Sequence, residues 1–252
     1  MTTPTTSLCF ATPDDIVVRG RSLPRELLGK TTFTAMIYFH LTGRDATPGQ
    51  IAVLDACLVA LMEHGLTPSA ISARLTYASA PEALQGAVAA GLLGVGSTFV
   101  GSSEGCAELL ARIVASTNPR AEAHAIASAA RGADARLPGF GHPLHRPVDP
   151  RTPALLAIAR EHGVYGPHCA ALELLAAAVE GEAGRAIPVN ATGAIAALIA
   201  DAELPIGILR GIALISRCAG LVGHLREEQE APTLRALLAG ADAAVPYEEE
   251  KR

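Results

Sequence analysis

Apolar residues recur at spacings of three and four along most of this 252-residue chain, and alanine is the main residue among them. That period puts apolar side chains on one face of a helix, and alanine is the strongest helix former. Runs of β-branched residues, which favour strands, are few. The pattern predicts an all-α fold, with one exception. At residues 15–21 we expect a short hairpin strand that turns at Arg19-Gly20-Arg21.

Composition limits the partners of such a chain. Half of its residues are hydrophobic, so it can bury a core, and disorder is excluded. Its net charge of -5 argues against nucleic acid as a partner, and every long apolar stretch is broken by Gly, Pro or polar residues, which argues against a membrane. Residues 1–6 have neither the basic start nor the apolar core of a signal peptide, so we expect a cytoplasmic protein.

The five cysteines are dispersed, odd in number and never spaced as CxxC; they are Cys9, Cys57, Cys106, Cys169 and Cys218. This spacing predicts neither a disulfide framework nor a zinc site, and we expect no bound metal.

Capping residues mark where several helices begin. Thr47-Pro48 is an N-cap followed by a first-turn proline, and Ser79 with Glu82 has the spacing of a capping box. The small apolar residues at 86–91 predict a helix buried in a core or a subunit interface, hence a homodimer or higher homo-oligomer. The expected helices are 24–29, 32–41, 47–63, 68–77, 81–93, 104–116, 120–132, 153–163, 168–181, 192–202 and 206–230, with a short one in the tail.

The segment 137–151, LPGFGHPLHRPVDPR, is the densest candidate site. Its prolines and glycines fix an irregular backbone that carries two histidines and two arginines. Arg presents paired donors to a carboxylate, and His can donate to a carbonyl or alkoxide oxygen. The alternative is a proline-rich linker with exposed basic side chains, which does not account for Gly-Phe-Gly-His followed by Asp-Pro-Arg.

Gly-Phe-Gly-His followed by Asp-Pro-Arg resembles the signature of the citrate synthase superfamily. The stretches 17–43, 61–69 and 80–101 are also similar to its short citryl-CoA-lyase-like branch and, more distantly, to the lyase module of ATP-citrate lyase. The resemblance implies an all-α fold with two helical domains, a cleft between them and a working dimer. The larger domain would comprise 1–118 and 193–252, and the smaller one 119–192.

The resemblance also implies carbon–carbon chemistry on a coenzyme A thioester, with no tightly bound cofactor. We expect a lyase that cleaves citryl-CoA, or a similar 3-hydroxy-3-carboxyacyl-CoA, to an acyl-CoA and a 2-keto acid such as oxaloacetate. The alternatives are a citrate-synthase-type acyltransferase that runs the condensation, and a catalytically impaired protein that binds CoA and a keto acid.

Four residues match substrate positions of the family. His142 would contact the keto or hydroxyl oxygen and accept the hydroxyl proton. His64, Arg151 and Arg217 would hold the substrate carboxylates, and an Arg among apolar neighbours, as Arg217 is, independently suggests an anionic partner. His224, about two helical turns after Arg217, is the one remaining histidine that we single out.

The resemblance assigns the coenzyme A site to the same loop. Pro138, Gly139, Phe140 and Gly141 would bind the adenine end, and Arg146 a phosphate. The alternative for Arg146 is a solvated surface charge.

Two departures from the family pattern concern the reacting centre. The turn containing Phe99 and Gly101 lacks the histidine of the synthases and resembles the lyase module instead. Asn190 is kept, but Thr192 stands where the family has its catalytic Asp, and a hydroxyl is no general base near neutral pH. The resemblance places Phe99, Gly101, Asn190 and Thr192 around the developing enolate. The alternative for Thr192 is that it only caps the helix that follows.

Overall fold

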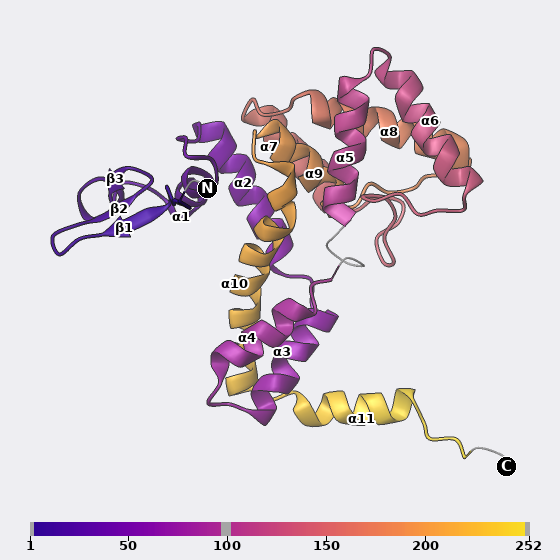
Figure 1. Cartoon of the computed structure of the whole chain (residues 1–252). Helices are drawn as coiled ribbons and strands as arrows, with labels where there is room; N and C mark the ends of the chain where they lie inside the picture. Colours follow the sequence, from indigo (N-terminus) through magenta and orange to yellow (C-terminus); the bar gives the residue numbers. More distant parts are fainter. Residues whose placement is uncertain (1–2, 97–101, 250–252) are drawn as a thin grey trace. The chain divides into compact units, whose positions relative to one another are not determined.

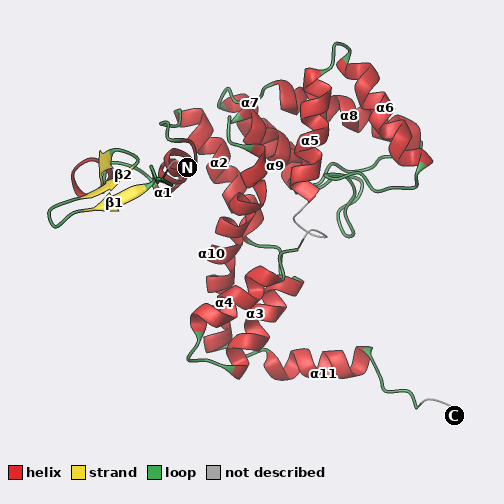
Figure 2. Ribbon diagram, viewed as in Figure 1, coloured by secondary structure: helices red, strands yellow, loops and turns green. Residues whose placement is uncertain are grey.

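The computed structural model describes residues 3–96 and 102–249 (Figure 1). Helices dominate it, as Figure 2 shows, which confirms the predicted all-α class. Every expected helix is present, with ends displaced by at most three residues. The helices are α1 (Phe33–Thr42), α2 (Pro48–Met62), α3 (Pro68–Ser79), α4 (Leu84–Leu93), α5 (Ser102–Ala115), α6 (Pro119–Gly132), α7 (Arg151–Glu161), α8 (Pro167–Ala183), α9 (Ala191–Asp201), α10 (Leu209–Glu230) and α11 (Leu234–Ala244), with single turns η1 (Leu23–Leu27) and η2 (Ile206–Ile208).

The strands lie near the N-terminus and form a small antiparallel sheet in the order β1-β2-β3. They are β1 (Cys9–Ala11), β2 (Ile16–Val18) and β3 (Arg21–Ser22). The predicted hairpin is confirmed, but its turn is shorter than expected, because Arg21 already pairs with Val18. The sequence did not predict β1, whose three residues are all exposed and carry no alternating pattern.

The chain divides into two compact units. Unit 1 comprises 1–57 and 102–209, and unit 2 comprises 58–101 and 210–252. The predicted domain limits near 118 and 192 both fall inside unit 1, where α5, α6, α8 and α9 pack on one another. The sequence-based domain division stays a prediction, distinct from this grouping by contacts.

The core of unit 1 centres on α9, whose residues from Ala194 to Ile199 are buried. This helix packs against α5, α7 and α8. Its last residue, Asp201, accepts hydrogen bonds from the backbone amides of Gly166, His168 and Cys169 at the start of α8 (2.8–3.0 Å). A buried carboxylate thus satisfies amides that have no partner within their own helix.

The core of unit 2 joins α3, α4 and α10 through small and branched apolar residues, which are Ala73, Ala87, Leu221 and Leu225. A Cβ at Gly91 would lie 2.6 Å from Leu221 Cδ1, so the close approach of α4 to α10 requires glycine at this position. Of the small residues at 86–91, which were predicted to be buried, Ala87 and Gly91 are buried and Ala89 is exposed. The predicted capping box is wrong. Ser79 ends α3, where its hydroxyl donates to the carbonyl of Leu75 (3.0 Å), and α4 begins only at Leu84.

Residues 206–230 are long and apolar enough to span a membrane by length and composition alone, contrary to our expectation. Core helices of soluble proteins meet the same criterion, and 33% of the apolar window in this segment is buried. Leu221 and Leu225 are fully buried, and a Cβ at Gly220 would lie 2.1 Å from the carbonyl oxygen of Met62 at the end of α2.

Candidate active site

The loop that carries Gly-Phe-Gly-His is joined to the segment before α9. Phe140 and Val189 form an isolated antiparallel bridge, and the amide of Gly141 donates to the carbonyl of Pro188 (2.8 Å). Phe140 is itself buried. Two segments far apart in the sequence are therefore fixed side by side.

Two glycines allow this contact. Gly139 has φ +83°, and a Cβ there would lie 2.6 Å from Cys106 Sγ and 2.9 Å from Gly193 Cα. A Cβ at Gly193 would lie 2.5 Å from the carbonyl oxygen of Gly139. Since a side chain at either position would displace backbone, both must be glycine.

Asn190 ties the loop to α9. It is the N-cap of that helix, and its Oδ1 accepts from the amide of Gly193 (3.1 Å) and from the hydroxyl of Thr192 (2.6 Å). Its Nδ2 donates to the carbonyl of Gly141 (2.9 Å). The side chain predicted to face the enolate therefore holds the His142 loop in place.

Thr192 belongs to a polar cluster and is not a helix cap. Asn190 takes the capping position, so the alternative that Thr192 only caps α9 is wrong. Because the Thr192 hydroxyl donates to Asn190, it can only accept from Ser102, whose Oγ lies 3.0 Å away. A chain of hydroxyls thus stands where the resemblance placed a carboxylate.

The loop does contain a carboxylate, that of Asp149, but its oxygens are already hydrogen-bonded within the protein. Asp149 is fully buried and accepts from the amide (3.1 Å), Nε (3.0 Å) and Nη2 (2.8 Å) of Arg151, and from the amide of Ala191 (3.1 Å). Burial raises the pKa of Asp149, but these hydrogen bonds and the guanidinium charge outweigh it and bring the pKa to about 2. Asp149 is therefore an anchor and no general base at neutral pH.

Arg151 keeps part of its donor capacity for a ligand. With Nε and one Nη2 hydrogen directed at Asp149, a substrate carboxylate could use Nη1 and the second Nη2 hydrogen. The side chain is 26% exposed, so a ligand can reach it.

His142 is held in one tautomer. Its Nδ1 accepts from the backbone amides of Leu144 (3.1 Å) and His145 (3.0 Å), and its ring stacks on that of His145 with centroids 4.4 Å apart. Since Nδ1 is an acceptor, the proton of the neutral ring is on Nε2. In this state Nε2 of His142 can donate a hydrogen bond but cannot accept a proton, whereas the predicted role was that of a proton acceptor.

The other two predicted carboxylate ligands belong to unit 2. His64 is exposed on the turn after α2, and its amide donates to Oε1 of Glu63 (2.7 Å). Burial lowers the pKa of Arg217 on α10, and the charge of Glu63 opposes this shift. Arg217 Nη1 is buried without a hydrogen-bond partner among the described residues. Unit 1 thus brings together His142, Arg151, Asn190 and Thr192, and unit 2 holds the remaining pair.

The residues predicted to bind coenzyme A differ in exposure. Gly139 and Phe140 are buried and serve packing, Pro138 and Gly141 are half-buried, and Arg146 is exposed. Coenzyme A binding by this loop stays a prediction.

The predicted positions Phe99 and Gly101 lie outside the described residues. The sequence did not predict the anchoring role of Asp149 or the pairing of Ser102 with Thr192. The Asp-Pro-Arg motif carried a signal for the first, because an Asp two residues before an Arg at a helix start can bond both its backbone and its side chain. No signal in the sequence pairs Ser102 with Thr192.

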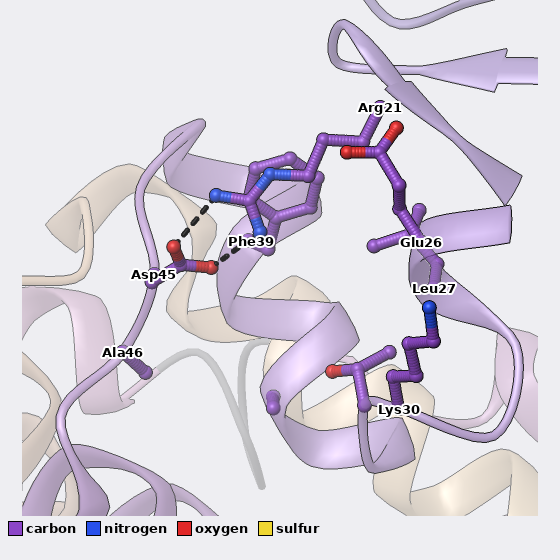
Figure 3. Close-up of a pocket in the computed structure, with 9 residues that line it drawn as sticks. Arg21, Glu26, Leu27, Lys30, Phe39, Asp45 and Ala46 are labelled. Atoms are coloured by element: carbon purple, nitrogen blue, oxygen red, sulfur yellow. Dashed lines mark hydrogen bonds and ion pairs between the residues drawn. The ribbon is translucent and has the colours of Figure 1, made fainter.

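A pocket elsewhere in unit 1 includes none of the predicted residues (Figure 3). Its wall contains Arg21, whose guanidinium stacks 4.5 Å from the centre of the Phe39 ring and bonds both oxygens of Asp45 (2.6 and 2.8 Å). This contact uses the charge of Arg21 to join β3 to α1 and to the segment before α2, which is a structural role.

Comparison with known proteins decides the family. Residues 17–236 match the citrate synthase C-terminal domain. The chain belongs to the citrate synthase family. The citrate synthase of Synechocystis is 24% identical to it over 220 residues, which are 84% of this chain and 53% of that enzyme. This family member thus spans about half the length of the curated relatives that it matches.

Solved structures similar to this chain include one of nearly the same length. Citryl-CoA lyase from Hydrogenobacter thermophilus is similar over 98% of this chain and 95% of its own, with a TM-score of 0.88 and 30% identity. ATP citrate lyase from Methanothrix soehngenii, solved in complex with citrate and coenzyme A, matches 100% of this chain and 42% of its own at TM-score 0.81. At 17% identity, the second match shows the fold alone.

Proposed function

We propose that this citrate synthase family member is a coenzyme A-dependent carbon–carbon lyase. It would cleave citryl-CoA, or a similar 3-hydroxy-3-carboxyacyl-CoA, to an acyl-CoA and a 2-keto acid such as oxaloacetate. The observation that carries the proposal is the joined loop and helix start, which bring His142, Arg151 and Thr192 into one site. The similarity to citryl-CoA lyase along nearly the whole of both chains supports the lyase direction.

The reaction breaks one carbon–carbon bond. The hydroxyl proton passes to solvent water, and the hydroxyl carbon becomes the keto carbon. The electrons of the broken bond form the enolate of the acyl-CoA, which then takes a proton from solvent at carbon. Nε2–H of His142 would stabilise the alkoxide that precedes bond cleavage. Arg151, His64 and Arg217 would bind the substrate carboxylates, as the family resemblance implies.

A second candidate is a protein that binds coenzyme A and a keto acid without efficient turnover. The observation that favours it is the Ser102–Thr192–Asn190 hydrogen-bond chain, which contains no carboxylate. The carboxylate that the loop contains, Asp149, is hydrogen-bonded to Arg151 and is not available as a base. Condensation from acyl-CoA and a keto acid is the third outcome, because both directions share one transition state.

The test is to incubate the purified chain with citryl-CoA and follow oxaloacetate. The lyase proposal expects turnover that falls by a factor of about 10² in His142→Ala, because one donor to a developing oxyanion is lost. The matched control is His124→Ala, which alters an exposed residue of α6 and should leave turnover unchanged. Absence of product, with His142→Ala identical to the wild type, would overturn the proposal.

The variant Thr192→Asp distinguishes an enzyme from a binding protein. If the hydroxyl chain suffices, Thr192→Asp changes turnover little or lowers it. If the chain binds its ligands without turnover, calorimetry detects coenzyme A or oxaloacetate binding, and Thr192→Asp creates activity by supplying a base.

We also propose that the protein is a cytoplasmic homo-oligomer. Unit 2 leaves large apolar side chains exposed, among them Val59, Leu66 and Leu93, and such surfaces are typical of subunit interfaces. Sedimentation of the full chain would show a mass of at least twice 25.9 kDa, and a monomer would contradict this proposal.

A further inference from the structure

Unit 2 contains a buried ionic cluster that the proposed function does not use. Its centre is Arg74 on α3, which is 1% exposed. Nη1 of Arg74 donates to Oε2 of Glu228 (2.9 Å), and Nη2 donates to Glu227. Glu228, also buried, accepts two further bonds from the amide and hydroxyl of Thr233 (2.6 and 2.7 Å). The buried cation is therefore matched by carboxylates, which its burial requires.

The same guanidinium fixes the state of a histidine. Nε and Nη2 of Arg74 lie 3.0 and 2.9 Å from Nδ1 of His224 on α10. An arginine can only donate, so Nδ1 must accept and cannot carry a proton. The proton of the neutral His224 ring is thereby placed on Nε2, on the side away from Arg74.

The Nε2 side of the ring lies beside Glu63. Nε2 of His224 is 2.9 Å from Oε2 of Glu63, which is an ion-pair distance without the geometry of a hydrogen bond. The other oxygen, Oε1, accepts from the amides of His64 and Gly65, both at 2.7 Å. Gly65 has φ +73°, so the chain reverses at this point with Glu63 as the acceptor inside the turn. One carboxylate thus links the His224 ring to the backbone of His64.

We propose that Arg74, His224 and Glu63 form a positioning relay that fixes the turn carrying His64. Arg74 sets the tautomer of His224, His224 orients the carboxylate of Glu63, and Glu63 holds the His64 amide. None of the three needs to contact the substrate. The role rests on the proposed function in that His64 is taken to bind a substrate carboxylate.

The relay predicts a specific kinetic change. His64 would bind the carboxylate in the ground state and the transition state alike, so loosening its turn should raise KM and leave kcat nearly unchanged. We expect His224→Phe and Glu63→Gln each to raise KM for citryl-CoA about tenfold, by analogy with the lower end of the loss when the outer hydrogen-bond partner of a metal-ligating histidine is removed. His224→Gln, which keeps an acceptor and a donor, should restore KM to within about twofold.

A matched control separates positioning from mere stability. Leu225→Ala removes a fully buried side chain one residue from His224 and should lower the melting temperature without changing KM. If Leu225→Ala raises KM as much as His224→Phe, or if neither His224→Phe nor Glu63→Gln changes it, the relay is wrong.

An independent readout needs no activity. In ¹⁵N spectra of the full chain, His224 should show Nε2 protonated and Nδ1 bare. The ring signals of His64 should move in His224→Phe and Glu63→Gln, and stay in Glu227→Gln. These shifts without citryl-CoA turnover would mean that the proposed function fails and the relay stands. Turnover with unmoved His64 signals and unchanged KM would mean the reverse.

Discussion

Two histidines of this molecule share one tautomer, but different groups impose it. In unit 1, Nδ1 of His142 accepts from the backbone amides of Leu144 and His145. In unit 2, Nδ1 of His224 accepts from the guanidinium of Arg74. The first arrangement depends on the path of a proline- and glycine-rich loop, and the second on one buried side chain. A loop can thus orient an imidazole with backbone amides alone. The imidazole on α10, which is packed in a core, is oriented by a cation that matching carboxylates neutralise.

The largest expected effect comes from removing the cation. Arg74→Met leaves Glu228 buried without its partner, so we expect the free energy of unfolding to fall by about 4 kcal/mol. In ¹⁵N spectra, Nδ1 of His224 should lose its signature as an acceptor of the Arg74 hydrogen bonds, and His142 should keep its state. Arg226→Met, which breaks an exposed ion pair with Glu230, should cost less than about 0.5 kcal/mol. An unchanged His224 in Arg74→Met would refute the difference between the two regions.

The corresponding change in unit 1 is Asp149→Asn. It places an amide against the donors of Arg151 and Ala191, so we expect a loss of about 3 kcal/mol in denaturant unfolding. Because the same carboxylate fixes the start of α7 and of α9, ligand binding should weaken as well. A loss below about 1 kcal/mol would show that backbone geometry alone holds the His142 loop.

The dependence of stability on acid pH should show the contribution of the Asp149 carboxylate. The pKa of Asp149 lies near 2 in the folded state, below its ordinary value of 3.8. Its contribution to stability is therefore present above the ordinary pKa and lost as the pH falls toward 2, by about 2 kcal/mol in total. Between pH 6 and pH 2, the free energy of unfolding should fall less steeply in Asp149→Asn than in the wild type. Parallel curves would contradict the assignment.

A smaller effect tests the backbone approach directly. Gly193→Ala puts a Cβ 2.5 Å from the carbonyl oxygen of Gly139, and we expect about 2 kcal/mol of destabilisation from the forced shift. The matched control is Gly181→Ala on α8, where a Cβ meets nothing within 4 Å. Helix propensity predicts a gain of about 0.5–1 kcal/mol there. Equal effects at the two positions would remove the packing argument.

The smallest expected effect is that of Glu227→Gln, at the exposed edge of the buried Arg74 cluster. Glu227 also bonds Arg74, but its side chain is 66% exposed, so water competes for it. Glu227→Gln should change the free energy of unfolding by less than about 0.5 kcal/mol and leave the His224 tautomer intact. A loss of several kcal/mol would mean that the buried Glu228 is not the main partner of the cation.

The sequence predicted the helices well, because alanine-rich periodic segments depend on local propensity, and the motif at 139–151 identified the loop. The sequence did not predict the features that depend on contacts between distant segments. Ser79 continues α3 although its spacing to Glu82 suggested a cap, and Asn190 takes the capping position that was one of two alternatives for Thr192. Nothing in the local sequence shows that Arg74 and His224, 150 residues apart, meet in a core.

A single-turnover experiment shows whether the His142 site acts on a citryl-CoA-type thioester. Enzyme in excess over citryl-CoA is quenched at intervals, and oxaloacetate is measured for the wild type and His142→Ala. The account predicts oxaloacetate formation in the wild type and a rate lower by a factor of about 10² in the variant. Intact citryl-CoA in both, or equal rates in both, would contradict it.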